Sequence, residues 1–159
     1  MLTTYVACFR MPKIMSEDIF EILLWKQLRL LHEEDVNNGM KWAKDYSDDP
    51  INAQFGFSIG QRAFFVVGLH PNSSRKARQF LVPAIAFNSH NQFTNLRRLK
   101  VLTEIRQVTR NNDQHQNGSI NPNLIPNDEN SSAFEYSGKR IQPDWIPDFK
   151  SLHPKIDLL

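Results

Sequence analysis

The stretch 64–78 concentrates the side chains of this sequence whose types and spacing could do chemistry. An apolar run of phenylalanine and valine leads into Gly68, Leu69 and His70, and Pro71 then ends the extended segment. Two serines and two arginines follow at once: Ser73, Ser74, Arg75 and Arg78. Imidazole binds metals, a helix that begins at a serine favours anions, and guanidinium groups bind carboxylates and phosphates. The stretch therefore predicts a ligand atom for a metal beside a receptor for a carboxylate or a phosphate.

A structural interpretation of the same residues is equally open. It consists of a core strand, a tight turn and a solvated basic helix. A histidine after a strand is more often a turn residue whose ring is hydrogen-bonded than a metal ligand. Arginines spaced i, i+3 share a helix face, and such a face is usually solvated. The functional interpretation gains weight because histidine, glycine, serines and arginines all fall between residues 68 and 78.

A second histidine, His90, also follows an extended apolar run and precedes an expected helix. If the strands before His70 and His90 are neighbours, both imidazoles could reach one site. No third ligand stands at a recognisable spacing, so the histidine pair alone is weak evidence for a metal. One imidazole on iron, with arginines for the propionate groups of a porphyrin, needs only what 64–78 supplies.

Several common catalytic motifs are absent from the sequence. It has no glycine-rich dinucleotide fingerprint, no Walker loop, no His-Glu-x-x-His and no Gly-x-Ser-x-Gly. Cys8, the single cysteine, has no local partner that would activate its thiol and cannot form an internal disulfide. These absences disfavour nucleotide-dependent and hydrolytic chemistry.

The elements that must position these residues follow from apolar periodicity. Strands are expected over 3–9, 53–59, 63–69 and 83–87. The middle two flank a short glycine-containing link, which predicts a β-hairpin. Helices are expected from Ser16 as N-cap to about residue 34, over 74–80 and over 91–110.

The order of these elements predicts an α+β fold: a small, mostly antiparallel sheet packed with two long helices and followed by a long irregular C-terminal loop region. The loop prediction rests on 111–132, which is rich in Asn, Ser, Pro and Asp. We expect one domain over 1–149 and a tail over 150–159. His32, near the end of the first long helix, is expected to be solvated or paired with the helix dipole.

Composition narrows the class of protein. The chain has 159 residues, with 19 basic and 17 acidic side chains and a formal net charge of +2. This balance gives no reason to expect nucleic acid or a membrane as a partner. No apolar run reaches the roughly 18 residues that span a bilayer, and the first residues lack the charged region of a signal peptide. A cytoplasmic location is expected.

Four blocks of the sequence resemble the YqcI/YcgG family. They are 64–75, 87–93 together with Leu96 and Arg97, 118–122, and 136–140. Looser similarity extends over about residues 5–149. Family members usually carry a further N-terminal segment before the part that corresponds to Thr3, so the resemblance implies an N-terminally short member.

The resemblance implies a function as well as a family. Members with assigned roles are haem-dependent oxygenases that hydroxylate a nitrogen of guanidino compounds such as arginine derivatives. A b-type haem, a small guanidino or amino-acid-like substrate and an electron donor are therefore expected. The alternatives are a non-enzymatic protein that binds haem or another small ligand, and an inactive shortened homologue.

The resemblance also implies residue roles. His70 becomes the leading candidate for the axial haem ligand, and His90 is the competing candidate or a distal group. The cofactor-binding set comprises Ser73, Ser74, Arg75 and Arg78, with the two arginines on the haem propionates. The substrate-binding set comprises Asn121, Tyr136, Ser137 and Arg140, of which Arg140 would suit a substrate carboxylate.

Overall fold

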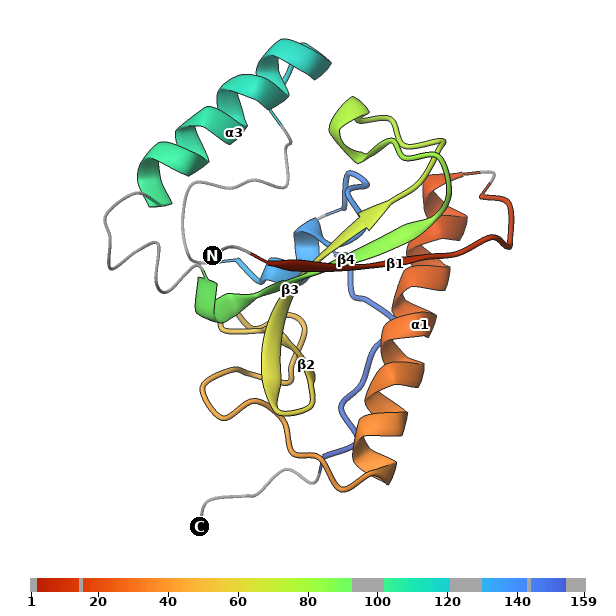
Figure 1. Ribbon diagram of the computed structural model, residues 1–159, viewed down its shortest axis with the longest axis vertical. Coiled ribbons are helices and arrows are strands. Elements are labelled where there is room, and N and C mark those ends of the chain that lie inside the picture. Colours follow the sequence, from red (N-terminus) through yellow and green to blue (C-terminus); the bar gives the residue numbers. More distant parts are fainter. Residues whose placement is uncertain (1–2, 15, 93–101, 121–129, 143, 154–159) are drawn as a thin grey trace.

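The computed structural model describes residues 3–14, 16–92, 102–120, 130–142 and 144–153. Its centre is a four-stranded antiparallel sheet with the strand order β1-β4-β3-β2. The helices and strands in chain order are β1 (Thr4–Cys8), α1 (Glu17–Asn37), β2 (Phe57–Ile59), β3 (Arg62–Leu69), η1 (Lys76–Arg78), β4 (Ala84–Ser89), α3 (Leu102–Asn117) and η2 (Ser132–Glu135), where η denotes a 3₁₀ helix. Figure 1 shows α1 running along the sheet and α3 standing apart from it. The predicted α+β class with a small antiparallel sheet is confirmed.

Helix α1 begins where its sequence predicts. The hydroxyl of Ser16 accepts a hydrogen bond from the backbone N–H of Ile19 at 3.2 Å, and Glu17 and Asp18 lie in the first turn. The helix continues to Asn37, three residues beyond the expected end. Its buried apolar face packs on the sheet through Phe20, Leu24, Trp25 and Leu28.

The predicted hairpin is confirmed as β2 and β3. Gly60 and Gln61 connect the strands with φ values of 55° and 63°. Two consecutive residues with positive φ match the twist of a two-residue hairpin turn. The first strand is shorter than expected, because β2 starts only at Phe57 and its pairing with β3 ends at Phe64.

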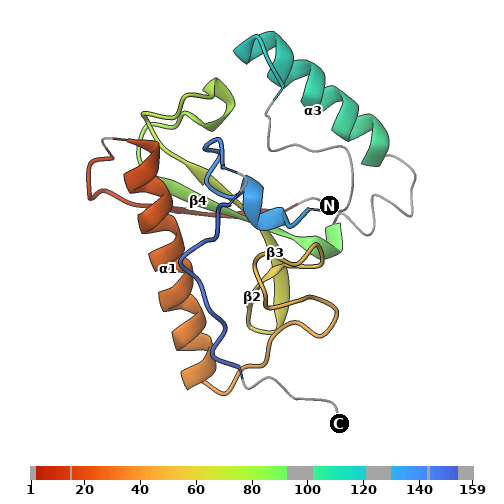
Figure 2. The ribbon, with the colours of Figure 1, turned by 180° about the vertical axis from the view of Figure 1, so that it is seen from behind.

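The rest of that edge of β3 is covered by the C-terminal part of the chain. The N–H of Gly68 donates to the carbonyl of Tyr136 at 2.7 Å, in the place where a longer β2 would pair. Further along the chain, residues 144–153 run beside α1, as Figure 2 shows. Phe149 joins the buried core, and Arg29 of α1 binds Asp148 at 2.8 Å.

Two expectations about helices need correction. The helix expected over 74–80 is a single 3₁₀ turn, η1. The second long helix was expected over 91–110, whereas α3 spans Leu102–Asn117; residues 93–101 lie outside the described residues. The helix extends past residue 110 into the predicted loop, because 111–117 contain no glycine or proline. Gly118, with φ of 70°, ends it through its N–H bond to the Gln114 carbonyl at 2.9 Å.

No described helix is both long enough and apolar enough to cross a membrane.

Candidate functional site

His70 lies directly after the last residue of β3, against the first turns of α1. Its side chain is 0 % exposed, and its ring stacks on Phe20 with a centroid distance of 4.3 Å and an interplanar angle of 27°. Neither ring nitrogen has a hydrogen-bond partner in the described part of the chain. Buried polar atoms almost always have such a partner, so an imidazole in this state needs an explanation.

Burial favours the neutral form of the His70 ring. Burial lowers its pKa below the usual value for histidine, and the carboxylate of Glu17 only partly opposes this shift. A neutral imidazole keeps a lone pair on one nitrogen, which is the form that ligates a metal. In charge and hydrogen bonding, the ring therefore fits an axial ligand.

The backbone fixes the position of His70. Its N–H donates to the Arg78 carbonyl at 3.0 Å, and its carbonyl accepts from the N–H groups of Phe80 at 3.3 Å and Ser73 at 3.4 Å. These bonds close the segment 70–80 into a compact loop. The histidine is thus held at the base of this loop rather than at its tip.

Gly68 allows α1 to reach the ring. A Cβ atom on Gly68 would lie 2.5 Å from Cε1 of Phe20 and 2.9 Å from the backbone oxygen of Tyr136. No real side chain fits at those distances. The missing side chain at Gly68 lets Phe20 approach β3 and stack on His70.

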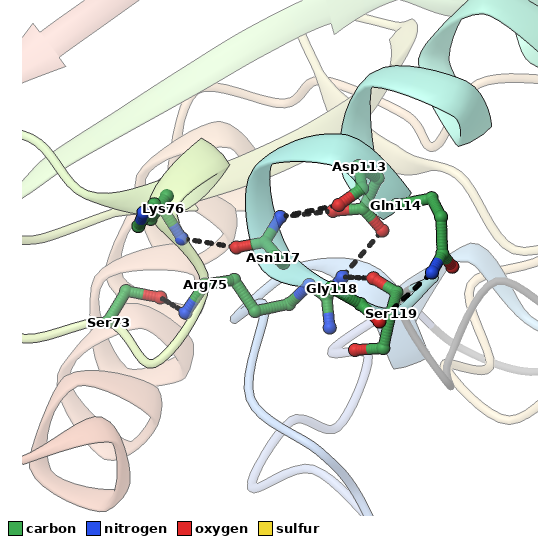
Figure 3. Close-up of polar contacts among 8 residues, drawn as sticks. All are labelled: Ser73, Arg75, Lys76, Asp113, Gln114, Asn117, Gly118 and Ser119. Carbon is green, nitrogen blue, oxygen red and sulfur yellow. Dashed lines mark hydrogen bonds and ion pairs between the residues drawn. The ribbon is translucent and has the colours of Figure 1, made fainter.

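Arg75 turns away from the sheet towards α3 (Figure 3). Its Nη2 atom lies 2.6 Å from Oδ2 of Asp113 and 2.7 Å from the Ser119 carbonyl, and both charged side chains are largely buried. Asn117 supports the pair, because its amide donates to Oδ1 of Asp113 at 2.8 Å and its oxygen accepts from the Lys76 N–H at 2.7 Å. This cluster fastens α3 to the loop that carries His70.

Arg78 takes a different direction from Arg75. Its Nη1 atom donates to the carbonyls of Gly68 at 3.2 Å and Tyr136 at 3.3 Å, and its Nη2 atom donates to the Glu135 carbonyl at 3.0 Å. Burial lowers the pKa of its guanidinium group. The expectation that the two arginines share one helix face is wrong, because η1 is too short to form such a face. Both guanidinium groups are bound by acceptors of this chain, Arg75 through Nη2 and Arg78 through Nη1 and Nη2.

The two serines of the loop also have internal partners. The Ser73 hydroxyl is buried and accepts from the Arg75 N–H at 3.3 Å. Ser74 donates to Oε1 of Glu17 with its N–H at 2.9 Å and with its hydroxyl at 2.8 Å. Instead of capping a following helix, Ser74 ties the loop to the start of α1.

His90 lies at the other end of the sheet. In the antiparallel register of β3 and β4, Leu69 pairs with Ala84 and Phe64 pairs with Ser89. The strands that precede the two histidines are neighbours, as the sequence reasoning supposed. Because they run in opposite directions, His70 and His90 are separated along the sheet by about 24 Å at roughly 3.4 Å per residue. The two histidines do not share a site. The His90 ring instead packs near Tyr46, with a centroid distance of 4.7 Å.

Two of the expected substrate residues lie in the core. Tyr136 is 0 % exposed, and its hydroxyl accepts from the Phe57 N–H at 3.3 Å and bonds the Phe64 carbonyl at 3.1 Å. Burial raises the pKa of this phenol, so it stays protonated. Ser137 is buried and donates to Oε1 of Glu21 at 3.0 Å. Arg140, in contrast, is exposed, and Asn121 lies outside the described residues.

The sequence reasoning missed three residues that build the site: Phe20, Glu17 and Asp113. Phe20 is hidden in an ordinary apolar helix stripe, and Glu17 in an ordinary acidic first turn. Asp113 stands in a stretch interpreted as loop. Its i, i+4 spacing from Asn117, together with the lack of glycine and proline over 111–117, indicated a helix there.

Two observations limit what the site can hold. Within the described ranges, no group of three or more His, Cys, Asp and Glu side chains is arranged to bind a metal ion. A hollow of about 280 Å³ does open on the sheet, lined by Tyr5, Arg62 and Phe64 among others, but it lies at the far end from His70. Among the described residues, His70 is therefore at most a lone metal ligand, and this hollow does not adjoin it.

Comparison with known proteins identifies the chain. The model of the YqcI/YcgG family matches residues 1–146, which is most of the sequence. No curated protein matches, and neither does any solved structure. The match covers every block on which the resemblance was based, including the loop that carries His70. The chain therefore belongs to the YqcI/YcgG family.

Proposed function

We propose that this protein is a haem-dependent oxygenase that hydroxylates a nitrogen of a small guanidino or amino-acid-like substrate, with His70 as axial ligand of the iron. One observation carries the proposal: the His70 ring is fully buried and both of its nitrogens lack a hydrogen-bond partner in the described chain. Iron coordination would satisfy one of these nitrogens, and a single histidine is a common axial ligand of b-type haem. The reaction class comes from the family resemblance.

The residues around His70 have positioning roles in this proposal. Phe20 stacks on the imidazole, and the backbone bonds of His70 to Arg78 and Phe80 fix the position of its backbone after β3. Burial keeps the ring neutral and ready to bind metal. The bound haem would supply the activation of oxygen, while the protein supplies the ligand, the orientation and a site shielded from water.

The arginines have structural roles in this proposal, and their contact with haem propionates stays a prediction. Arg75 anchors the loop to α3 through Asp113, and Arg78 anchors it to the edge of β3. Arg140, whose side chain is exposed, is the proposed receptor for a substrate carboxylate.

A second candidate is a haem- or small-ligand-binding protein without catalytic activity. The observation that favours it is the placement of Tyr136 and Ser137, whose polar groups are used inside the core. A buried tyrosine with satisfied bonds is not available to orient a substrate. A protein of this kind would bind haem through His70 and form no product.

The test of haem binding is the visible spectrum of protein purified after expression with added haem. We expect a Soret band that disappears in His70→Ala and persists in His90→Ala and in His115→Ala, a control on an exposed face of α3. In His70→Gly, added imidazole should restore the band, because free imidazole can replace the missing ring. A Soret band that is unchanged in His70→Ala, in a variant whose circular dichroism is native, would reject His70 as ligand.

The test of catalysis is product analysis by mass. The haem-loaded protein is given arginine-like substrates, oxygen and a reductant, and the expected product is heavier by one oxygen atom. Formation of this product only in the presence of haem supports the oxygenase. Haem binding without product supports the non-enzymatic candidate, and the absence of any haem spectrum supports the inactive homologue.

A further inference from the structure

Strand β1 is an open edge of the sheet. It pairs with β4 on one side, and no described strand lies on its other side. Two of its large apolar side chains are exposed, Tyr5 by 69 % and Val6 by 44 %. An exposed strand edge offers a row of backbone donors and acceptors to any other strand.

The outward-facing backbone groups of β1 can be identified. Phe9, just after the strand, donates its N–H inward to the Pro83 carbonyl at 2.8 Å. In an antiparallel ladder this direction alternates along the strand, so Tyr5 and Ala7 also face β4. The N–H and carbonyl groups of the intervening residues therefore face away from the sheet: those of Thr4, Val6 and Cys8.

This edge lacks the features that usually protect a strand from pairing. Natural edges are blunted by lysine or other charged residues, by proline or by bulges. The segment 3–9 contains no charged residue and no proline, and its pairing with β4 runs without interruption from Thr4 to Cys8. β-branched and aromatic residues give it a high strand propensity. The edge is thus suited to accept another strand.

We propose that β1 pairs antiparallel with β1 of a second copy of this chain, around a two-fold axis through Val6. In this register Val6 faces its own counterpart, and Thr4 faces Cys8 of the other copy. It is the register that joins every outward backbone group of Thr4, Val6 and Cys8 on both strands. The two sheets then form one continuous sheet.

Side chains also fit this register. Tyr5 lies opposite Ala7 of the second copy, so that a large exposed ring covers a small residue on the same face. Val6 packs against Val6 across the axis on the other face. Because the strand carries no charge, two identical copies meet without like-charge repulsion.

The expected association is weak. Stable interfaces bury about 1,200–2,000 Å² in total, and one pair of short edge strands contributes less than this. We therefore expect a dimer that forms between micromolar and millimolar concentration and dissociates on dilution. Sedimentation velocity over that range, on the full chain, should show a monomer–dimer equilibrium.

Two variants at Val6 test the edge directly. Val6→Pro removes an outward N–H and leaves the ladder with β4 intact, so it should abolish the dimer while circular dichroism is unchanged. Val6→Lys, which places two ammonium groups face to face, should do the same if the proline variant folds poorly. Val6→Thr, a matched control with similar strand propensity, should still dimerise.

Cysteine cross-linking tests the register. In Val6→Cys combined with Cys8→Ser, the two cysteines face each other at about 5.5 Å between Cα atoms, a distance that a disulfide spans. Under mild oxidation this variant should give a covalent dimer. Tyr5→Cys combined with Cys8→Ser should not, because the two cysteines would be displaced along the strands.

Three results would contradict the proposed dimer or its register. A protein that remains monomeric at millimolar concentration and gives no cross-link at position 6 overturns it. A dimer that survives Val6→Pro and Val6→Lys also overturns it, because its interface then lies elsewhere. Preferential cross-linking at position 5 overturns the proposed register.

Discussion

The ring of Phe20 stacks on His70 while it also fills the space above Gly68. The centroids of the two rings are 4.3 Å apart, and a Cβ atom on Gly68 would lie 2.5 Å from the Phe20 ring. One aromatic side chain from α1 thus connects the strand end to the candidate ligand. The position of the His70 ring therefore depends on how closely α1 approaches β3 at Gly68.

Gly68→Ala should destabilise the protein and disturb the site. The added methyl group meets both the Phe20 ring and the Tyr136 carbonyl, and overpacking of this kind costs about 1–3 kcal/mol. Urea unfolding measures the loss. Val67→Ala, at a half-buried neighbour on the same strand, should cost about 1 kcal/mol and leave the haem spectrum unchanged. A fully stable Gly68→Ala protein would contradict the close contact.

Breaking the Arg75–Asp113 pair should loosen α3. Asp113→Ala leaves a buried guanidinium without its carboxylate, and such a loss costs about 3–5 kcal/mol for fully buried pairs. The side chains are 11 % and 9 % exposed, so we expect a value near the lower end, about 3 kcal/mol. Hydrogen exchange should show faster exchange in α3, and the double change with Arg75→Met should recover part of the loss.

The control for this prediction is the surface pair of Arg29 and Asp148. Asp148 is 81 % exposed, and pairs of this kind contribute about 0–1 kcal/mol. Asp148→Ala should therefore change unfolding very little. Equal losses from Asp113→Ala and Asp148→Ala would show that the buried pair has no special role.

Tyr136→Phe should destabilise the fold without changing its shape. The hydroxyl satisfies the Phe57 N–H and the Phe64 carbonyl inside the core, and its removal leaves both groups short of a partner. A loss of about 1–3 kcal/mol is expected in the free energy of unfolding. Tyr5→Phe, at a residue that is 69 % exposed, should be neutral. A neutral Tyr136→Phe would contradict the hydrogen bonding described here.

Stability should fall in mildly acidic solution, and His32 should contribute to the fall. Contrary to expectation this side chain is 1 % exposed, and its Nε2 atom accepts the Leu152 N–H at 2.9 Å. Burial lowers its pKa, and His153 lowers it further, while Asp35, Asp48 and Glu33 oppose the shift. The folded state therefore binds its proton less readily than the unfolded chain.

The direction of the pH effect on stability follows from this difference in pKa between the folded and the unfolded state. Above the unfolded pKa of about 6.5 both states are neutral and the contribution of His32 is complete. As the pH falls from there towards the lowered pKa of the folded state, the free energy of unfolding should decrease. Urea titrations at several pH values measure this slope, which should be reduced in His32→Gln and unchanged in His115→Gln. A wild-type slope in His32→Gln would remove His32 as the cause.

Much of the fold could be predicted from local sequence patterns. The start of α1 at Ser16, the hairpin at Gly60 and Gln61 and the small antiparallel sheet depend on neighbouring residues, and these elements were expected correctly. Capping, turn conformation and apolar periodicity are properties of a few consecutive side chains. Strand β3, which ends just before His70, was likewise predictable from consecutive side chains.

The partners of the polar residues could not be predicted in this way. Arg75 binds an aspartate 38 positions away, and Arg78 binds carbonyls of η2 and of the residue after it, at still longer separations. The opposite directions of β3 and β4 separate His70 from His90, although both histidines follow strands. Spacing along the chain identifies which groups can form bonds, but the packing of helices on the sheet determines which of them meet. For this reason the sequence indicated a reactive loop, whereas the tertiary structure assigned its arginines to internal contacts and gave the His70 ring nitrogens no hydrogen-bond partner among the described residues.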